Sequence, residues 1–280
     1  MTTAGAQVRV GVDIGGTFTD IAMEIGTTLH STKVLTDYSF PENAIVEGIA
    51  QVCGTAGIAL SDIDLIIHGT TLATNALIER RGARTAFITT RGFRDVIEMR
   101  TESRFEQYDL NIVLPAPLVP RDERFVVTER IGPDGSVLKA LDLPEVEALC
   151  DSIIAAGFES VAIGLIHSYL NDSHERAIRD VLRRRAPDLS VSISAEVSPQ
   201  MREFQRFNTV CANAFVKPLM ASYLNRLVGR LQEAGTDCPV FMIHSGGGII
   251  SLESAIEFPV RLLESGPAGG AIFAAHVASS

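Results

Sequence analysis

The sequence has few cysteines, and none of them is arranged for a metal ribbon or a disulfide framework. Its 280 residues include only four cysteines, at positions 53, 150, 211 and 238, and no two of them form a Cys-x-x-Cys pair. Closely spaced cysteines are typical of zinc ribbons and of small secreted domains held by disulfides. The cysteine content therefore argues against both classes and fits a chain that stays reduced.

The sequence also lacks a basic excess and a membrane-spanning run. Lys and Arg total 24 against 34 Asp and Glu, a formal net charge of -10, so nucleic acid and anionic membranes are not expected as main partners. The first residues, MTTAGAQ, have neither the charged nor the apolar region of a signal peptide, and no apolar run is long enough to cross a bilayer. We therefore expect a soluble cytoplasmic protein.

Apolar residues make up 46% of the chain, enough for one large domain or two modest ones. Antiparallel strands come first and strand–helix alternation follows, a pattern that predicts an α/β fold with a mixed sheet flanked by helices. A turn at residues 132–135 predicts a β-hairpin between strands 125–130 and 136–139, and Pro218 is expected to interrupt a long helix. Other strands are expected near 8–13, 21–23, 28–36, 64–68, 85–89, 161–166, 189–194 and 239–244, and helices near 41–57, 72–81, 96–99, 144–156, 173–185, 198–235 and 271–278.

The stretch VRVGVDIGGTFTD at residues 8–20 contains the clearest chemical pattern. Glycine amides and threonine hydroxyls at a tight turn can surround phosphate oxygens, and a nearby carboxylate can hold Mg²⁺ or polarise water. The stretch contains neither the Gly-x-x-x-x-Gly-Lys nor the Gly-x-Gly-x-x-Gly motif, and a plain hairpin with a capping aspartate is the simpler alternative. We predict a phosphate-binding hairpin that uses Asp13, Gly15, Gly16, Thr17, Thr19 and Asp20.

Three further turns combine glycine with hydroxyl side chains. The segment His68–Thr71 follows a strand and precedes a helix, so it could bind an anion or substrate, or a threonine could simply cap the helix. Asn75 lies one helical turn beyond Thr71 and could share its face. The segments His244–Gly248 and Ser265–Gly270 could approach a nucleotide closely, although each alone is also compatible with an ordinary loop or helix start. Together the four turns favour a nucleotide cleft between lobes.

Three of these segments, together with a fourth at residues 89–95, resemble the hydantoinase A/5-oxoprolinase family, which includes acetone and acetophenone carboxylase subunits. They are VGVDIGGTFTD at 10–20, HGTTLATNAL at 68–77, TTRGFRD at 89–95 and SGPAGG at 265–270. The resemblance implies the actin/sugar kinase/Hsp70-like ATPase fold, with ATP and Mg²⁺ between two lobes and the second lobe incomplete here. It also implies a hydantoinase/oxoprolinase N-terminal domain at 1–195 and the beginning of a hydantoinase A domain at 196–280.

The resemblance further implies a reaction in which ATP phosphorylates the oxygen of a cyclic amide before the ring is hydrolysed. Such phosphoryl transfer depends on positioning and on cations that offset charge. The expected substrates are hydantoins, 5-oxoproline or other lactams, and the expected partner is a hydantoinase B-type subunit. The residues expected to act in catalysis are Asp13, Thr17 and His68, and Asp13 is also the expected Mg²⁺ ligand. Those expected around the nucleotide are Gly15, Gly16, Thr17, Thr19, Asp20, Gly246, Gly247, Gly266 and Gly269. Those expected at the substrate are Thr70, Thr71, Asn75 and Arg91.

Three alternatives remain at this point. The chain could be the ATP-binding subunit of a ketone carboxylase, in which a ketone rather than an amide is phosphorylated. It could be a sugar or small-acid kinase, although the zinc-binding cysteine cluster of one common bacterial sugar-kinase group is missing. It could also be a non-catalytic assembly partner that uses the ATPase fold to change shape, in which case activity of the assembly would survive Asp13→Ala.

The chain stops at Ser280, before the second Asp-x-Gly-Gly-Thr-type hairpin that the family places shortly after the Ser-Gly-Pro turn. We therefore expect the N-terminal portion of a longer enzyme or one piece of a split subunit. The 280-residue chain alone should bind ATP weakly and hydrolyse little or none of it, because the second of the two phosphate-binding hairpins is missing. An ATPase assay with and without a cyclic amide checks this, and substrate-stimulated hydrolysis by the chain alone would contradict it.

Overall fold

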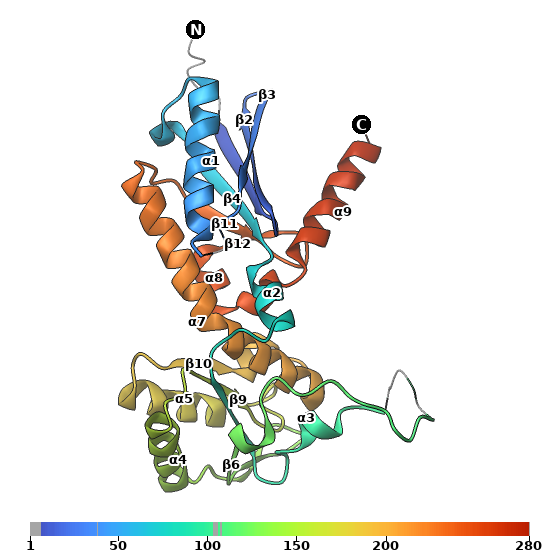
Figure 1. Ribbon diagram of the computed structural model, residues 1–280. Helices are drawn as coiled ribbons and strands as arrows, with labels where there is room; N and C mark the ends of the chain where they lie inside the picture. Colours follow the sequence, from blue (N-terminus) through green and yellow to red (C-terminus); the bar gives the residue numbers. More distant parts are fainter. Residues whose placement is uncertain (1–6, 38, 103–105, 107, 280) are drawn as a thin grey trace. The chain divides into compact units, whose positions relative to one another are not determined.

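The structure is a computed structural model that describes residues 7–37, 39–102, 106 and 108–279, and the chain forms two compact units (Figure 1). Unit 1 contains residues 1–79 and 219–280, and unit 2 contains residues 80–218. Each unit has its own hydrophobic core. These compact units divide the chain at other positions than the sequence domains expected at 1–195 and 196–280, and that sequence division stays a prediction.

Unit 1 is built on a six-stranded mixed sheet with the strand order β12-β11-β4-β1-β2-β3. The central strand β1 pairs antiparallel with β2 and parallel with β4. The predicted hairpin, its third strand and the mixed character of the sheet are thereby confirmed. The strands are β1 (Val8–Ile14), β2 (Phe18–Ile25), β3 (Thr28–Leu35), β4 (Leu65–Thr70), β11 (Val240–Ile243) and β12 (Ile249–Ser251).

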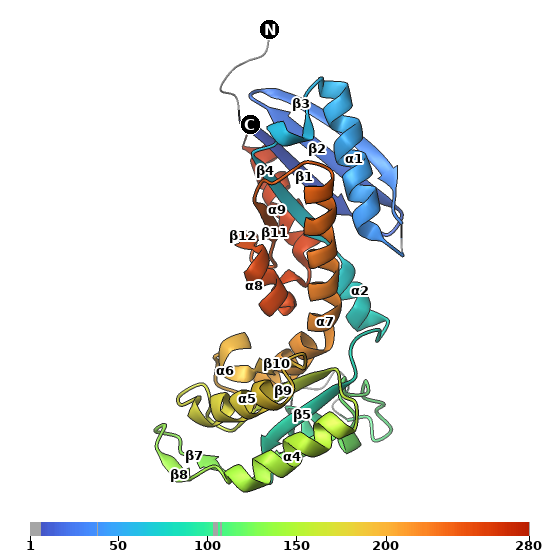
Figure 2. The ribbon, with the colours of Figure 1, turned by 90° about the vertical axis from the view of Figure 1, so that its left-hand side faces the viewer.

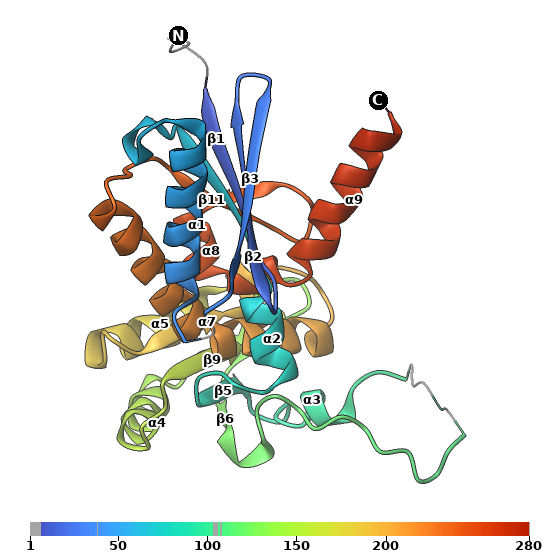
Figure 3. The ribbon, with the colours of Figure 1, turned by 45° about the horizontal axis from the view of Figure 1, so that its top comes forward.

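Strict alternation along β1 and β2 decides which face of this sheet is covered. Every second residue of β1, from Val8 to Ile14, is buried, and the residues between them are exposed. The buried face packs against helix α1 (Pro41–Ala56), which presents Ile45, Ile49 and Val52 to it. Helix α9 (Ser265–Ala278) contacts β4 and β11 instead and lies across the other face from α1 (Figures 1 and 3). The remaining short helices of unit 1 are η1 (Leu60–Asp62), α2 (Leu72–Ile78), α8 (Leu252–Glu257) and η3 (Pro259–Leu262).

Unit 2 is built on a four-stranded parallel sheet with the order β10-β9-β5-β6 (Figure 2). Strands β5 and β9 are buried along their whole length because helices α4 and α5 cover one face and helix α7 packs Phe207 against Phe87 on the other. The elements are β5 (Thr85–Thr90), α3 (Val96–Met99), η2 (Arg121–Glu123), β6 (Arg124–Val127), β7 (Arg130–Ile131), β8 (Val137–Lys139), α4 (Leu143–Ala155), β9 (Ser160–Gly164), α5 (Ser173–Arg185), β10 (Ser190–Ile193), α6 (Ser194–Val197) and α7 (Glu203–Glu233).

Three local predictions need correction. Pro218 lies inside α7 without ending it, since buried side chains on both sides of Pro218 offset the cost of about 3 kcal/mol that a proline imposes on a helix interior. The segment 125–130 is not one hairpin strand: its first part pairs parallel with β5, and only Arg130–Ile131 pair with β8. Helix α9 begins at Ser265 rather than 271, because Pro267 occupies a first-turn position whose amide needs no intrahelical partner.

The helices carry no sign of a membrane crossing. Within the part of the chain that the structure describes, no helix is both long enough and apolar enough to span a bilayer.

The contact between α1 and the sheet predicts opposite effects for two glycines of the same helix. A Cβ at Gly48 would lie 2.9 Å from Cγ1 of buried Ile21 and 3.5 Å from Cγ2 of Val34, whereas a Cβ at Gly54 would meet nothing within 4 Å. Gly48→Ala should lower the free energy of unfolding by about 1–3 kcal/mol through overpacking. Gly54→Ala should raise it by up to about 1 kcal/mol through helix propensity.

Urea unfolding followed by circular dichroism measures both effects. Equal stabilisation by the two alanines would show that α1 does not pack on β2 and β3 as described.

Candidate functional site

The open face of the unit 1 sheet and helix α9 enclose a cavity of about 860 Å³. That volume lies within the range of small-molecule and cofactor sites. Strands β1, β2, β3, β4 and β11 form one side and the first turns of α9 form the other. Five glycines, which allow a ligand to approach the backbone, line it: Gly11, Gly69, Gly266, Gly269 and Gly270.

Two carboxylates and one ammonium group lie on the sheet side of this cavity. Asp13 of β1 is paired in register with Asp20 of β2, and Asp20 is paired with Lys33 of β3. The Lys33 Nζ lies 3.0 Å from Oδ1 of Asp20, so the charge of Asp20 is already partly offset. Asp13 forms no ion pair with any residue that the structure describes.

The pKa of the Asp13 carboxyl is raised, first by loss of solvent around it and then by the negative charge of Asp20. A divalent cation beside Asp13 would reverse both effects. Mg²⁺ is usually held by one or two carboxylates together with phosphate oxygens and water. Asp13 and its neighbour Asp20 could supply the carboxylates of such a site. The described residues contain no group of three or more His, Cys, Asp or Glu side chains that could form an all-protein metal cage.

Gly69 makes room for the Asp13 side chain. The two residues are register partners in the parallel pair of β1 and β4. A Cβ at position 69 would lie only 3.2 Å from Oδ1 of Asp13. Glycine at this position of the HGTT segment therefore fixes where the carboxylate can sit, a role that the sequence analysis did not assign to it.

The turn between β1 and β2 is held by its own backbone and by Thr36. The amide of Gly15 donates to the Phe18 carbonyl at 2.9 Å, and the Thr36 hydroxyl donates to the Gly15 carbonyl at 3.1 Å. Thr19 is fully buried with its hydroxyl 3.1 Å from that of Thr36, so it offers no surface for the predicted phosphate contact. The exposed tip of the turn consists of Gly16 and Thr17.

His68 lies inside unit 1 rather than at its surface. Its Nδ1 is 3.4 Å from the Val12 carbonyl oxygen and its Nε2 is 2.7 Å from the Tyr223 hydroxyl. Since a carbonyl only accepts, Nδ1 carries the proton and Nε2 accepts from Tyr223. Burial lowers the pKa of His68 to about 4, so the ring is neutral. It links β1, β4 and α7, and the geometry gives no support to the predicted catalytic contact.

The predicted substrate residues are divided between the two units. Thr70 is buried, and its hydroxyl accepts from the Leu72 amide at 3.2 Å as part of the start of α2. The Asn75 side chain donates to the Thr71 hydroxyl at 3.4 Å, so these two share a face as expected, but neither lines the cavity. Arg91 belongs to unit 2, where it pairs with Glu145 and donates to Thr128 at 2.9 Å.

The glycines of the two later turns have different places. Gly266 and Gly269 line the cavity from α9. Gly246 and Gly247 form the β11–β12 turn, where Gly247 has a φ of +81° and a Cβ would lie 2.9 Å from Ile272 Cδ1 of α9. That turn therefore supports α9 and does not line the cavity. Lys33 was missed by the sequence analysis, although counting the register back from the β2–β3 turn places it opposite Asp20.

Two family models match most of the chain. Residues 9–186 match the model described as hydantoinase/oxoprolinase N-terminal region, and residues 206–280 match the model described as hydantoinase/oxoprolinase.

Individual proteins show the same likeness over nearly the whole chain. The caprolactamase subunit alpha of Pseudomonas jessenii is 34% identical over 271 residues, which are 94% of this chain and 39% of that protein. The 5-oxoprolinase of Saccharomyces cerevisiae is 31% identical over 305 residues, covering 95% of this chain and 23% of that protein. The nucleotide-free structure of acetone carboxylase superposes with a TM-score of 0.87 at 25% identity, covering 98% of this chain and 41% of the other. The chain thus spans about two fifths or less of the length of these relatives.

The buried imidazole predicts that unit 1 loses stability in acid. The pKa of His68 is about 4 in the folded chain and about 6.5 in the unfolded one, so between these values only the unfolded chain binds the proton. At pH values above the pKa of His68 in the unfolded chain, this group should not lower the free energy of unfolding. That free energy should then fall as the pH drops toward 4, by up to about 3 kcal/mol from this group.

Urea unfolding at a series of pH values, for the wild type and for His68→Gln, isolates this contribution. Asp13 and Glu175 titrate in both proteins and cancel in the difference, whereas glutamine cannot take up the proton. The variant should be less stable at neutral pH but less sensitive to acid. Parallel curves for the two proteins would contradict the neutral buried imidazole.

Proposed function

This chain belongs to the hydantoinase/oxoprolinase family, and we propose on that premise that it is the nucleotide-binding portion of an ATP-dependent enzyme that hydrolyses cyclic amides. The family models that match most of the chain support the class. The relatives named caprolactamase and 5-oxoprolinase support a lactam or a similar ring as substrate. The observation that carries the proposal is the glycine-lined cavity with Asp13 unpaired at its wall.

Residues of the cavity and of the hairpin tip have different proposed roles in binding ATP and Mg²⁺. Asp13 is the proposed Mg²⁺ ligand, and Lys33 holds the neighbouring Asp20 in place. Gly266 and Gly269 let the nucleotide approach the start of α9 closely. Gly16 and Thr17 are exposed at the hairpin tip and are not among the lining residues, and we propose that they contact phosphate oxygens beyond the cavity. When bound, ATP supplies a phosphoryl group that turns the amide oxygen into a leaving group.

The residues of this chain contribute position and charge rather than covalent chemistry. Phosphoryl transfer is accelerated mainly by holding the reacting groups in line and by offsetting the charge of the phosphates. Burial, and after it repulsion from Asp20, raises the pKa of Asp13, and a bound cation would favour the charged carboxylate against both effects. Thr71, Asn75 and Arg91 remain proposed substrate contacts outside this cavity.

A partner subunit is part of the same proposal. The Pseudomonas jessenii relative is named as a subunit, which supports an assembly of more than one chain. A hydantoinase B-type chain is the partner we propose.

A ketone carboxylase is the second candidate, and the superposition on acetone carboxylase favours it. The two reactions differ in one requirement. Carboxylation needs bicarbonate as well as a ketone, whereas ring opening needs only water. ATP hydrolysis that depends on both a ketone and bicarbonate would therefore select the carboxylase.

The test of the proposal is Asp13→Asn in the complete enzyme, isolated with the subunits that accompany it. Removing the negative charge removes the Mg²⁺ ligand, so ATP hydrolysis stimulated by a lactam such as 5-oxoproline should fall by about a hundredfold or more. The measurement is release of ADP and of the ring-opened acid over a panel of lactams, hydantoins and ketones.

Asp188→Asn is the matched control, because Asp188 is exposed in unit 2 and does not line the unit 1 cavity. It should retain full activity. Full activity of Asp13→Asn would overturn the proposed role of Asp13. Failure of every lactam and hydantoin of the panel to give a ring-opened acid would overturn the proposed reaction.

A further inference from the structure

Unit 2 contains a cavity of its own, of about 670 Å³. One wall is the segment that follows strand β5, represented by Phe93, Val96 and Arg100. The other wall is Arg202–Gln205, where the chain enters α7 after β10 and α6. Both walls therefore come from segments beyond the carboxyl ends of parallel strands. This is the edge of a parallel sheet at which ligands usually bind.

Two arginines on these walls lack a carboxylate partner. Among the residues that the structure describes, neither Arg100 nor Arg202 forms an ion pair. Nearby arginines are paired: Arg121 with Asp95, and Arg124 with Glu98. Arg100 donates one hydrogen bond to the Pro115 carbonyl. This bond holds the guanidinium in place and leaves its other N–H groups available, since a guanidinium has five such donors.

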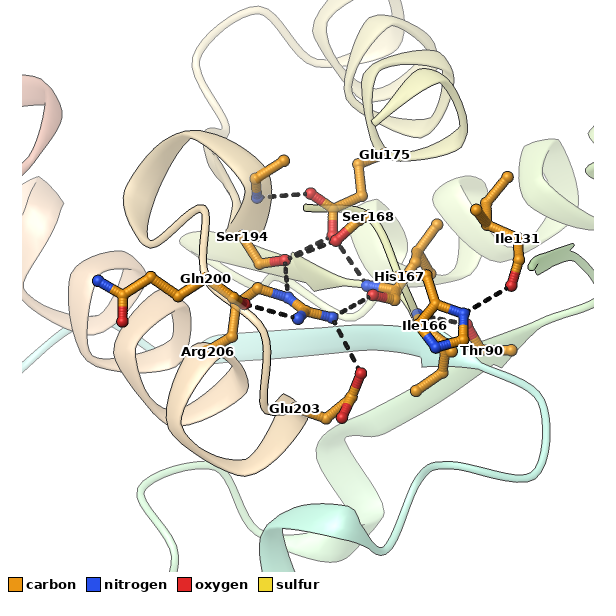
Figure 4. Close-up of polar contacts among 12 residues, drawn as sticks. Thr90, Ile131, Ile166, His167, Ser168, Glu175, Ser194, Gln200, Glu203 and Arg206 are labelled. Atoms are coloured by element: carbon orange, nitrogen blue, oxygen red, sulfur yellow. Dashed lines mark hydrogen bonds and ion pairs between the residues drawn. The ribbon is translucent and has the colours of Figure 1, made fainter. Parts of the chain in front are cut away.

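The carboxylate on the α7 side is already engaged. Glu203 Oε1 lies 3.8 Å from Nη2 of Arg206, a side chain with no exposed surface (Figure 4). Arg206 is held in place because it donates to the Leu165 carbonyl at 2.7 Å and to the Ser194 hydroxyl at 3.1 Å. Its charge offsets that of Glu203. Glu102 is then the one carboxylate among the lining residues without such a partner, and it is exposed.

The same two arginines have strained backbones. The φ of Arg100 is +62° and that of Arg202 is +83°, in the left-handed region that side chains other than glycine avoid. Only five non-glycine residues in the described part of the chain have a positive φ, and two of them line this one cavity. Strain of this kind persists only where the surrounding structure holds it, and such residues cluster at ligand-binding and active sites.

Apolar side chains complete the lining. Phe93, Val96 and Phe204 face the cavity beside the arginines. The Phe93 ring is held by the Arg130 guanidinium, whose central carbon lies 4.7 Å from the ring centroid. The cavity thus offers fixed hydrocarbon surface next to two arginines that form no ion pair with a described residue, and the exposed Glu102 is the one lining carboxylate that Arg206 does not offset.

We propose that this cavity binds a small organic carboxylate, with its charged group between Arg100 and Arg202 and its hydrocarbon body against Phe93 and Phe204. Guanidinium groups bind carboxylates through paired N–H donors, which is the recognition this site provides. The site lies wholly within unit 2. It is independent of the nucleotide site proposed in unit 1.

Isothermal titration of the purified chain with hexanoate tests the proposal, with hexanamide as the uncharged ligand of the same size. Hexanoate should bind saturably, and hexanamide about tenfold or more weakly, because the arginines lose their anionic partner. Arg202→Gly should lose hexanoate binding to the same extent. Because glycine accepts a positive φ, this variant should also be at least as stable to heat as the wild type.

Arg184→Gln is the control, since Arg184 is exposed in the last turn of α5 and does not line the cavity. It should bind hexanoate as the wild type does. Three results would overturn the proposal: equal affinity for hexanoate and hexanamide, unchanged hexanoate binding by both Arg202→Gly and Arg100→Gln, or equal competition by inorganic phosphate, which would indicate a general anion site.

Discussion

The two-residue alternation of the β1–β2 hairpin is the constraint on which the rest of unit 1 depends. Because Val8, Val10 and Val12 face α1, the residues between them must face the other way. Asp13 and Asp20 are therefore brought together on the face that α9 crosses. A shift of one residue in either strand would turn the carboxylate of that strand toward the core and expose the apolar residues of that strand. The core and the proposed metal site thus share a single register.

In unit 2 a charged side chain is buried in the interior rather than placed on an open face of the sheet. There a fully buried arginine is tolerated because backbone carbonyls and a serine hydroxyl satisfy its donors and a glutamate lies near it. Figure 4 shows this network continuing from Arg206 through Ser194 to Glu175, which accepts from the Leu165 and Ala195 amides. The network fixes the start of α7 against the carboxyl edge of the sheet. Among the described residues, neither Arg100 nor Arg202 of the adjacent cavity forms an ion pair, and Arg100 has one backbone carbonyl as acceptor. That contrast distinguishes a structural charge from one available to a ligand.

Much of the fold was predictable because its signals are local. Alternation in β1, the proline and glycine at the ends of α1, and the apolar runs of β5 and β9 each indicate an element without knowledge of its neighbours. The site was predictable only in part. The chemistry of Asp13 was evident from the hairpin motif, whereas the burial of His68 and Thr19 depends on Tyr223 and Thr36, partners supplied by other elements. The roles of Lys33, Gly69 and Arg202 likewise arise from register, close approach and backbone strain, which no motif records.

Asp13 forms no ion pair with a described residue, and its proposed role is to hold the cation of a bound nucleotide. Nuclear magnetic resonance of the carboxyl carbons, followed through a pH titration, measures the pKa of Asp13 directly. In the free protein the pKa of Asp13 should lie above the usual aspartate value, because the carboxyl is partly desolvated and lies near the negative charge of Asp20. Saturating Mg²⁺ and ATP should lower that pKa, since a bound cation favours the charged form. An Asp13 pKa that does not change on addition of Mg²⁺ and ATP would contradict this role.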